Sequence, residues 1–284
     1  MVTSETSQRP SLSLRIAAYL ALCLISAWLA MPFFWMLITA VKSSAEISVY
    51  PPTWLPTRWH WGNYALAWSM APFGRFYVNS IATGVFTTVL QVVFSLFMAY
   101  AFVFIRFPAK NVVLMAVLAT MMIPDEMKLV PNFLLLYRLG WIDTYYALII
   151  PPVAHAFPVF VLYQQLRSVP RSLVEAAQAD GASHFHILVQ VIAPISRPVL
   201  AAATLVALLG RWNDYLWPLV VTNSERMRTL PIGMAYLRKQ AEEGATPWNL
   251  LMASAVFVVI PIVLLYTVVQ RQFVEGITRG ALKG

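Results

Sequence analysis

Two short stretches of the chain place charged and amide side chains inside long apolar runs. They are PDEMK at residues 124–128 and RWNDY at residues 211–215. An unpaired charge at the centre of a lipid bilayer costs about 2.5–3.5 kcal/mol, so we expect these side chains to face protein or water. Side chains three residues apart on a helix are neighbours. Each stretch can therefore form its own ion pair, Asp125 with Lys128 and Arg211 with Asp214.

The depth of both stretches points to a shared role in moving a solute. Each lies roughly 15–19 residues from the same side of the membrane, so the two reach a similar depth at the helical rise of about 1.5 Å per residue. Aromatic and amide groups together suit a sugar-like ligand. The alternative is that the charged groups only hold neighbouring helices together. The residues expected to line a solute path are Asp125, Glu126, Trp212, Asn213, Asp214 and Tyr215.

Other chemistry finds little support in the chain. No GxxxxGK[ST] loop is present, so the chain cannot cradle ATP phosphates itself. His184 and His186 would point apart on a helix, and no cysteine or carboxylate completes a metal site with them. An integral-membrane enzyme would need a compact acid–base or metal constellation. A self-standing channel or carrier is the other alternative, and internal inverted repeats would favour it.

The elements that must position these groups are membrane helices. The chain has 284 residues, of which 60% are hydrophobic and 11% charged, whereas soluble domains carry about 25% charged residues. The long apolar runs are continuous rather than alternating, which favours helices over a barrel. Six runs exceed the roughly 20 residues needed to cross a bilayer. We predict spans at residues 14–41, 76–105, 112–137, 145–166, 195–222 and 248–269.

Charge distribution gives the expected orientation. An even number of spans places both termini on one side, and that side carries ten Lys and Arg residues against eight on the other. The excess favours a cytoplasmic location for both termini. The net charge of +8 is spread over the loops, so positive loops at a lipid surface explain it better than nucleic acid, and no nucleic-acid partner is expected. Residues 1–13 form a cytoplasmic N-terminal segment, residues 14–269 the membrane domain and residues 270–284 a cytoplasmic tail.

Residues 168–194, here named the EAA loop, form the longest polar interruption in the second half of the chain. Ser168 is predicted to cap a first short helix, with Pro170 in its first turn. Gly181 permits a sharp turn, and Ser183 can cap a second short helix that ends near Pro194. Two short helices would not stay folded in water alone. We therefore expect this loop to dock on a partner.

The loop resembles the EAA loop of ATP-binding-cassette importer permeases. The resemblance rests on EAA at residues 175–177, followed at family spacing by Gly181 and Pro194. Val191 and Ala193 stand where the family has Ile and Leu. Further stretches resemble carbohydrate importers of the maltose permease type, and some also the glycerol-3-phosphate branch. These are residues 79–80, 99–102, 106–111, 122–131, 212–237 and 270–284.

The resemblance implies an all-α integral membrane fold: the six-transmembrane-helix domain of a type I importer permease with a cytoplasmic EAA coupling helix. It implies a multi-pass protein of the inner membrane that forms, with a second homologous permease, a path for a sugar or a glycerol-3-phosphate-like solute. The other implied partners are a cytoplasmic ATPase dimer, which binds ATP and Mg, and an extracytoplasmic solute-binding protein. This chain itself is expected to carry no cofactor.

The same resemblance assigns residues to the ATPase contact. In the tail, Arg279 and Lys283 are expected to lie along the ATPase, and the tail is expected to be unstructured until bound. In the EAA loop, the expected coupling residues are Glu175, Ala176, Ala177, Asp180, Gly181, Ala182, Phe185 and Pro194.

Overall fold

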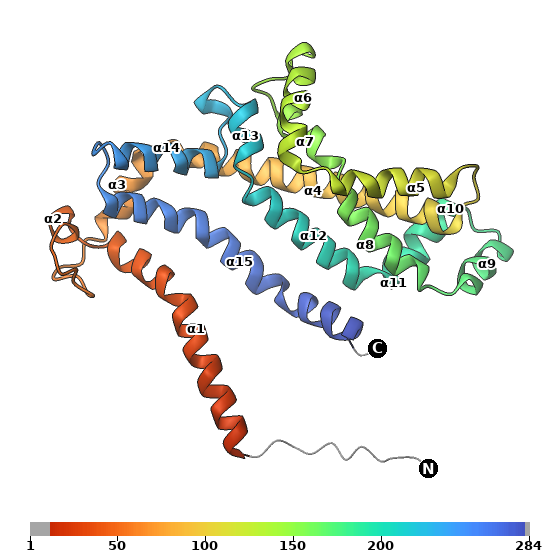
Figure 1. Cartoon of the computed structure of the whole chain (residues 1–284), viewed down its shortest axis with the longest axis horizontal. Helices are drawn as coiled ribbons and strands as arrows, with labels where there is room; N and C mark the ends of the chain where they lie inside the picture. The colour runs from red at the N-terminus through yellow and green to blue at the C-terminus, as the bar shows by residue number, and fades with distance from the viewer. Residues whose placement is uncertain (1–11, 282–284) are drawn as a thin grey trace. The chain divides into compact units, whose positions relative to one another are not determined.

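A computed structural model describes the backbone of residues 12–281 and the side chains of residues 12–267. Within that part of the chain every regular element is a helix (Figure 1), which confirms the all-α prediction. The α-helices are α1 (Leu12–Ala40), α2 (Ser44–Ile47), α3 (Gly62–Ser69), α4 (Phe73–Phe104), α5 (Lys110–Ala119), α6 (Asp125–Arg138), α7 (Tyr145–Val153), α8 (Ala156–Arg167), α9 (Arg171–Ala179), α10 (His184–Ile187), α11 (Ala193–Ile195), α12 (Arg197–Trp212), α13 (Leu216–Val221), α14 (Leu230–Glu242) and α15 (Trp248–Ala281). Short 3-10 turns η1 (Thr120–Met122) and η3 (Glu225–Met227) and a π-helical segment η2 (Leu188–Ile192) complete the series.

The chain divides into two compact units. The first comprises residues 1–70 and 238–257, and the second residues 71–237 and 258–284. In the first unit, the Asn63 side-chain amide donates to the carbonyls of Ala40 and Lys42 at 2.8 and 2.9 Å. The Asn249 amide donates to the same Lys42 carbonyl at 3.0 Å. These bonds join the end of α1 to α3 and to the start of α15, where Ala40, Ala67 and Ala253 pack together.

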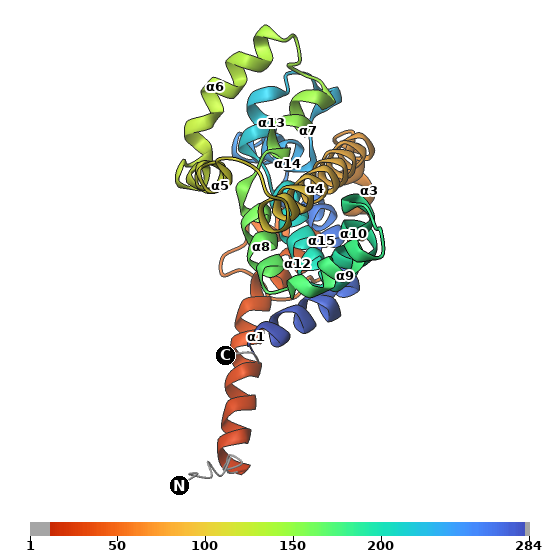
Figure 2. The same ribbon diagram turned by 90° about the vertical axis from the view of Figure 1, so that its right-hand side faces the viewer.

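The second unit is built around helix α4. This helix packs along α7, α8 and α12, and α8 and α12 lie beside it in both views (Figures 1 and 2). Small and polar residues let membrane helices approach closely. A Cβ at Gly84 would already meet Leu208 of α12 at 3.4 Å. The buried polar residues of α4 are Asn79, Ser80, Thr83, Thr87, Thr88, Gln91 and Ser95.

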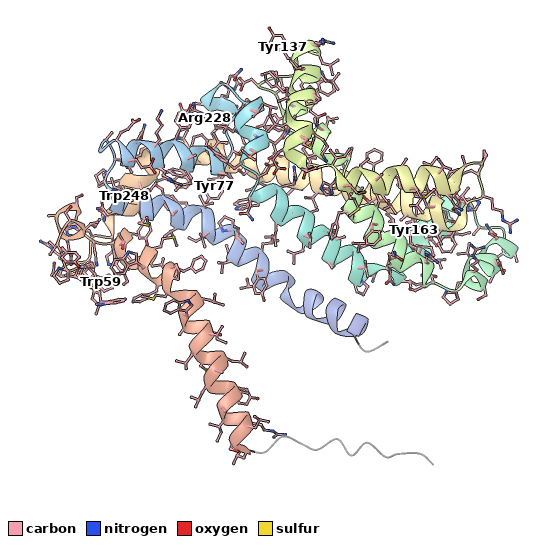
Figure 3. All side chains as sticks on the ribbon, in the orientation of Figure 1. Trp59, Tyr77, Tyr137, Tyr163, Arg228 and Trp248 are labelled. Carbon is pink, nitrogen blue, oxygen red and sulfur yellow. The ribbon has the colours of Figure 1, made fainter. Side chains whose placement is uncertain are left out.

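Four helical segments of the described part are long and apolar enough to cross a membrane: α1, α4, α7 with α8, and Trp248–Thr267 of α15. They match the predicted first, second, fourth and sixth spans. A fifth candidate is the pair His184–Ile195 and Arg197–Trp212, which is bent by 84°. The exposed apolar side chains of α1 project around its whole length (Figure 3), as expected of a helix that faces lipid or another subunit.

The predicted third and fifth spans differ from continuous helices. Residues 112–137 divide into α5 with η1 and then α6, with a break at Ile123 and Pro124. The fifth begins at Arg197 rather than Ile195 and is interrupted at residues 213–215. Pro124 causes the first break because it lacks an N–H and restricts the residue before it. The six-span count stays a prediction.

Candidate functional site

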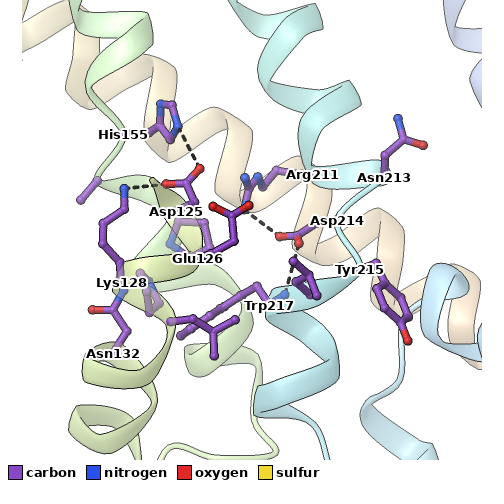
Figure 4. A pocket seen from close by; sticks show the side chains of 15 residues that line it. Asp125, Glu126, Lys128, Asn132, His155, Arg211, Asn213, Asp214, Tyr215 and Trp217 are labelled. Carbon is purple, nitrogen blue, oxygen red and sulfur yellow. Dashed lines mark hydrogen bonds and ion pairs between the residues drawn. The ribbon is translucent and has the colours of Figure 1, made fainter. Parts of the chain in front are cut away.

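Three interruptions between helices lie around one cavity of about 410 Å³ in the second unit (Figure 4). The breaks precede α6, separate α7 from α8, and separate α12 from α13. Helix breaks at membrane depth are tolerated where they line a cavity, because the freed backbone groups need polar partners. The polar residues around the cavity are Asp125, Glu126, Lys128, Asn132, His155, Arg211, Asn213, Asp214, Tyr215 and Trp217. The sequence placed two polar stretches at one depth, and the structure brings both to the same cavity.

Both predicted ion pairs are present. Lys128 Nζ lies 2.5 Å from Asp125 Oδ1, and Arg211 Nη1 lies 2.9 Å from Asp214 Oδ2. The backbone N–H of Trp217 donates to Asp214 Oδ1 at 3.4 Å, so Asp214 also caps the first turn of α13. Asp125 occupies the first turn of α6, where the helix dipole favours a carboxylate.

His155 joins this cluster, and sequence reasoning missed it. Its Nε2 lies 3.9 Å from Asp125 Oδ2, and Figure 4 shows the Asp125 carboxylate between Lys128 and His155. Its Nδ1 accepts from the backbone N–H of Phe157 at 3.4 Å and so caps α8. The signal that could have located His155 is the Pro151-Pro152 pair just before it, since two prolines predict a break in a span.

Only some of the aromatic and amide residues of the second stretch, residues 211–215, line the cavity. Asn213 and Tyr215 line the cavity, whereas Trp212 does not. Trp212 is only 8% exposed, and its indole N–H finds no hydrogen-bond acceptor within the described side chains. Successive helical residues point about 100° apart, so Trp212 cannot face the same space as Arg211.

Two larger cavities adjoin the first. One of about 810 Å³ shares Asp125, Lys128 and His155 with it. The other, of about 560 Å³, is mostly apolar and also includes His155. His155 therefore lies where a polar space meets apolar ones.

The EAA loop folds as two short helices around Gly181. Gly181 has φ +80°, a conformation that side chains disfavour, which confirms the predicted sharp turn. The Ser183 hydroxyl accepts from the His186 backbone N–H at 3.3 Å and caps α10, as predicted. The predicted cap at Ser168 is wrong. Ser168 instead ends α8 and donates its hydroxyl to the Gln165 carbonyl, because Pro170 directly precedes α9.

The loop is packed against its own chain. Val174, Ile187 and Leu188 are buried with residues of α4 and α8 in one core cluster. The Tyr100 hydroxyl of α4 lies 3.0 Å from His184 Nδ1. Intramolecular burial therefore holds the loop folded, so its folding needs no docked partner, and docking on a partner stays a prediction.

The predicted coupling residues lie mainly on the opposite, exposed face. Ala177 and Ala182 are half-buried against the core cluster, and Phe185 is 64% exposed and stacks on Phe97. No ion pair joins Glu175 to Arg171 among the described side chains. The exposed members are Glu175, Ala176, Asp180, Gly181 and Pro194.

The predicted tail differs in part. Its backbone continues α15 as far as Ala281, so residues 270–281 are helical rather than unstructured. The helix continues because the tail has no proline to stop it. Arg279 lies in this helix with its side chain outside the described residues, and Lys283 lies wholly outside them. Among the side chains that the structure describes, no group of three or more His, Cys, Asp or Glu could hold a metal ion.

Hydrogen bonds of the buried Asn79 side chain also hold the loop at residues 222–229. The Asn79 side-chain amide donates to the carbonyls of Arg226 and Arg228 at 2.9 and 2.7 Å. Its oxygen accepts from the Tyr145 hydroxyl at 2.6 Å. Arg228, labelled in Figure 3, lies with its guanidinium carbon 3.6 Å from the centre of the Tyr236 ring.

Asp143 holds the same loop from the α6–α7 link. Its Oδ1 accepts from the backbone N–H groups of Asn223 and Ser224 at 2.9 and 3.0 Å. Burial acts to raise the pKa of this carboxyl, but hydrogen bonds from the Ser224 hydroxyl and from these two N–H groups outweigh it. The pKa of Asp143 therefore lies below its ordinary value.

Comparison with known proteins identifies the relatives of this chain. Residues 91–279 match the family described as binding-protein-dependent transport system inner membrane component. The arabinooligosaccharides transport system permease protein AraQ of Bacillus subtilis is 31% identical over 95% of this chain and 96% of its own length. The sn-glycerol-3-phosphate transport system permease protein UgpE of Agrobacterium fabrum is 32% identical over 93% of this chain and 95% of its own.

A solved structure is similar throughout. A chain of a bacterial ABC transporter involved in the import of the acidic polysaccharide alginate superposes with a TM-score of 0.81 at 26% identity. The match covers 93% of this chain and 99% of that one. It confirms the importer-permease fold class.

Proposed function

Because the chain belongs to the family of binding-protein-dependent transport system inner membrane components, we propose that it is the permease subunit of an ATP-driven importer for a sugar or a glycerol-3-phosphate-like solute. The observation that carries this proposal is the extent of the family match. Residues 91–279 include both the cavity and the EAA loop. The chain is thus an inner membrane transport component whose relatives are transporters rather than enzymes.

The cavity supplies the path in this proposal. Three broken spans give it polar backbone and side-chain groups away from the lipid. Its two ion pairs lower the free-energy cost of placing charged side chains inside the membrane. A solute would cross between this chain and a second, homologous permease. In this arrangement the chain crosses the membrane six times, with α5 to α6, α7 to α8 and α12 to α13 as broken spans and both termini in the cytoplasm.

The EAA loop supplies the coupling. Its buried face fixes it to α4 and α8, and its exposed face is free to enter a groove of a cytoplasmic ATPase dimer. ATP and Mg would bind to that ATPase, and an extracytoplasmic solute-binding protein would deliver the solute. The tail, with Arg279 and Lys283, would lie along the ATPase. Removing residues 279–284 should then lower solute-stimulated ATP hydrolysis without preventing membrane insertion.

The coupling proposal is tested at Gly181. A Cβ at this position would meet nothing within 4 Å, so the main effect of Gly181→Val is backbone strain of about 1–2 kcal/mol. Gly181→Asn is the matched control, because Asn tolerates positive φ. We expect Gly181→Val to lower ATP-dependent uptake strongly and Gly181→Asn to retain most of it, while both still assemble with the partner permease.

Charge reversal on the exposed face gives a second variant. Glu175 is exposed and lies in the EAA sequence, so Glu175→Lys leaves the core cluster intact. We expect weakened ATPase association or hydrolysis that solute no longer stimulates. Normal uptake by both Gly181→Val and Glu175→Lys would show that the loop is only a connector.

A further inference from the structure

The charges of the cavity distinguish between solute classes that sequence identity leaves open. Relatives at 31 and 32% identity are named for arabinooligosaccharides and for sn-glycerol-3-phosphate, and the similar structure belongs to an importer of an acidic polysaccharide. Neutral and anionic solutes therefore occur among comparably distant relatives. The cavity itself carries more information, because an anion needs positive charge that is not already neutralised.

Neither cation of the cavity is free. Lys128 pairs with Asp125 and Arg211 pairs with Asp214, at 2.5 and 2.9 Å. Arg211 is the residue best suited to bind phosphate or carboxylate through two parallel hydrogen bonds, but one of its terminal nitrogens is already committed to a carboxylate.

The cavity also contains one carboxylate more than its cations can pair with. Glu126 lines the cavity and forms no ion pair with any side chain of residues 12–267. Three carboxylates, Asp125, Glu126 and Asp214, thus face two cations, so the cavity carries one net negative charge while His155 is neutral. Even a protonated His155 only balances the charge.

The same groups suit hydroxyls. A hydroxyl both donates and accepts hydrogen bonds. The cavity offers carboxylate acceptors, the spare N–H groups of Arg211 and the amide of Asn132, whereas the Asn213 amide nitrogen already donates to the Leu209 carbonyl at 3.0 Å. The rings of Tyr215 and Trp217 add apolar surface. A volume of about 410 Å³ falls within the range of small-molecule sites, about 300–1,000 Å³.

Resting on the function proposed above, we propose that this subunit passes a neutral, polyhydroxylated solute, a saccharide without phosphate or carboxylate groups. The paired cations and the surplus carboxylate disfavour anions, and the mixed donors and acceptors hydrogen-bond to sugar hydroxyls. Glu126 is then a specificity-determining residue, because it adds the surplus negative charge that repels an anion from the cavity.

The first test uses the complete importer, with its partner permease, ATPase and binding protein, in proteoliposomes. The labelled probes are arabinose oligosaccharides and diacetylchitobiose as neutral solutes, and glycerol-3-phosphate and alginate oligosaccharides as anions. We expect ATP-dependent accumulation of a neutral probe that excess anionic probe does not inhibit. Preferred accumulation of an anionic probe would overturn the solute class but leave the importer function standing. Failure to accumulate any probe would count against the proposed function instead.

The second test changes the charge at position 126, and the direction in which solute uptake changes shows whether the cavity charge sets the solute preference. Glu126→Lys creates an unpaired cation, so uptake of the neutral probe should fall about tenfold or more, while Glu126→Gln, which keeps an acceptor, should lower it about two- to threefold. If the solute were an anion, both changes would raise uptake. Glu243→Lys is the control, because Glu243 is exposed in the turn directly after α14, and among the described side chains its only ion pair is a 3.8 Å contact with Lys239.

Co-purification of the ATPase checks that each variant assembles. If Glu126→Lys fails to assemble, Glu126→Gln alone decides: a modest loss supports the inference and a gain overturns it. A gain in uptake of the neutral probe by either Glu126 variant would overturn the inference.

Discussion

Replacing Asn79 by alanine is expected to release the loop at residues 222–229. Asn79 is fully buried on α4, and it holds the carbonyls of Arg226 and Arg228 through its amide and the Tyr145 hydroxyl through its oxygen. The Arg75 guanidinium also donates to the Arg226 carbonyl, from Nε at 3.2 Å. Alanine would remove all three bonds to Asn79 at once.

The magnitude follows from the groups left without partners. A buried polar group that loses its only hydrogen bond costs about 1–3 kcal/mol. Two groups lose theirs, the Arg228 carbonyl and the Tyr145 hydroxyl, because Arg75 still reaches the Arg226 carbonyl, so the range is about 2–6 kcal/mol. Both carbonyls regain water once the loop moves, so we expect a value in the lower half of this range, a loss of about 3 kcal/mol.

Trypsin measures this local release directly. Arg226 lies on the loop and is exposed, but cleavage requires the loop to open. A loss of about 3 kcal/mol raises the open population about 100-fold, since about 1.4 kcal/mol is a factor of ten. Where opening is fast relative to cleavage, the cleavage rate rises by the same factor.

Tyr145→Phe is the matched control, because it removes one of the three bonds and keeps both carbonyls held. We expect a loss of about 1 kcal/mol and a cleavage rate within about tenfold of the wild-type protein. Equal cleavage rates for Asn79→Ala and the wild-type protein would refute the reasoning that Asn79 holds the loop.

Two further predictions concern packing and pH. A Cβ at Gly233 would collide with the buried ring of Phe76, so Gly233→Ala should lower stability by about 1–3 kcal/mol, whereas Gly210→Ala, where a Cβ meets nothing within 4 Å, should raise it by up to about 1 kcal/mol; thermal unfolding in detergent compares them, and equal melting temperatures would contradict the packing argument. The lowered pKa of Asp143 means that its contribution to stability is full above the unfolded pKa of about 3.9 and is lost as pH falls through the folded value. Between pH 7 and pH 3 the wild-type protein should therefore lose more stability than Asp143→Asn, which tolerates the positive φ of this position; identical pH profiles would show that the carboxylate contributes nothing.

Periodicity and composition predicted most of the fold. The apolar runs located four membrane-length helical segments within a few residues, and Gly181 and Ser183 located the turn and the cap of the EAA loop. The breaks were harder to predict. Prolines 124, 151 and 152 are visible in the sequence, but whether a proline kinks a span or divides it depends on which neighbouring groups satisfy the freed backbone.

The candidate site could be predicted only in part. Charge spacing gave the pairs Asp125–Lys128 and Arg211–Asp214, because such pairs form within one helix turn. Their meeting in one cavity, the presence of His155 and the exclusion of Trp212 depend on how separate helices pack. A local sequence pattern carries no information about that packing.

The most direct test of the central claim measures whether the cavity is a water-filled path. In a Cys23→Ala background, Asn213→Cys should react with a membrane-impermeant thiol reagent in the assembled importer, and its reaction rate should change when ATP is bound. The control Leu264→Cys, an exposed apolar position on α15, should stay unreactive because lipid or a second subunit covers it. A cysteine at position 213 that remains inert in every state of the transport cycle would contradict the account and leave the cavity as an internal packing defect.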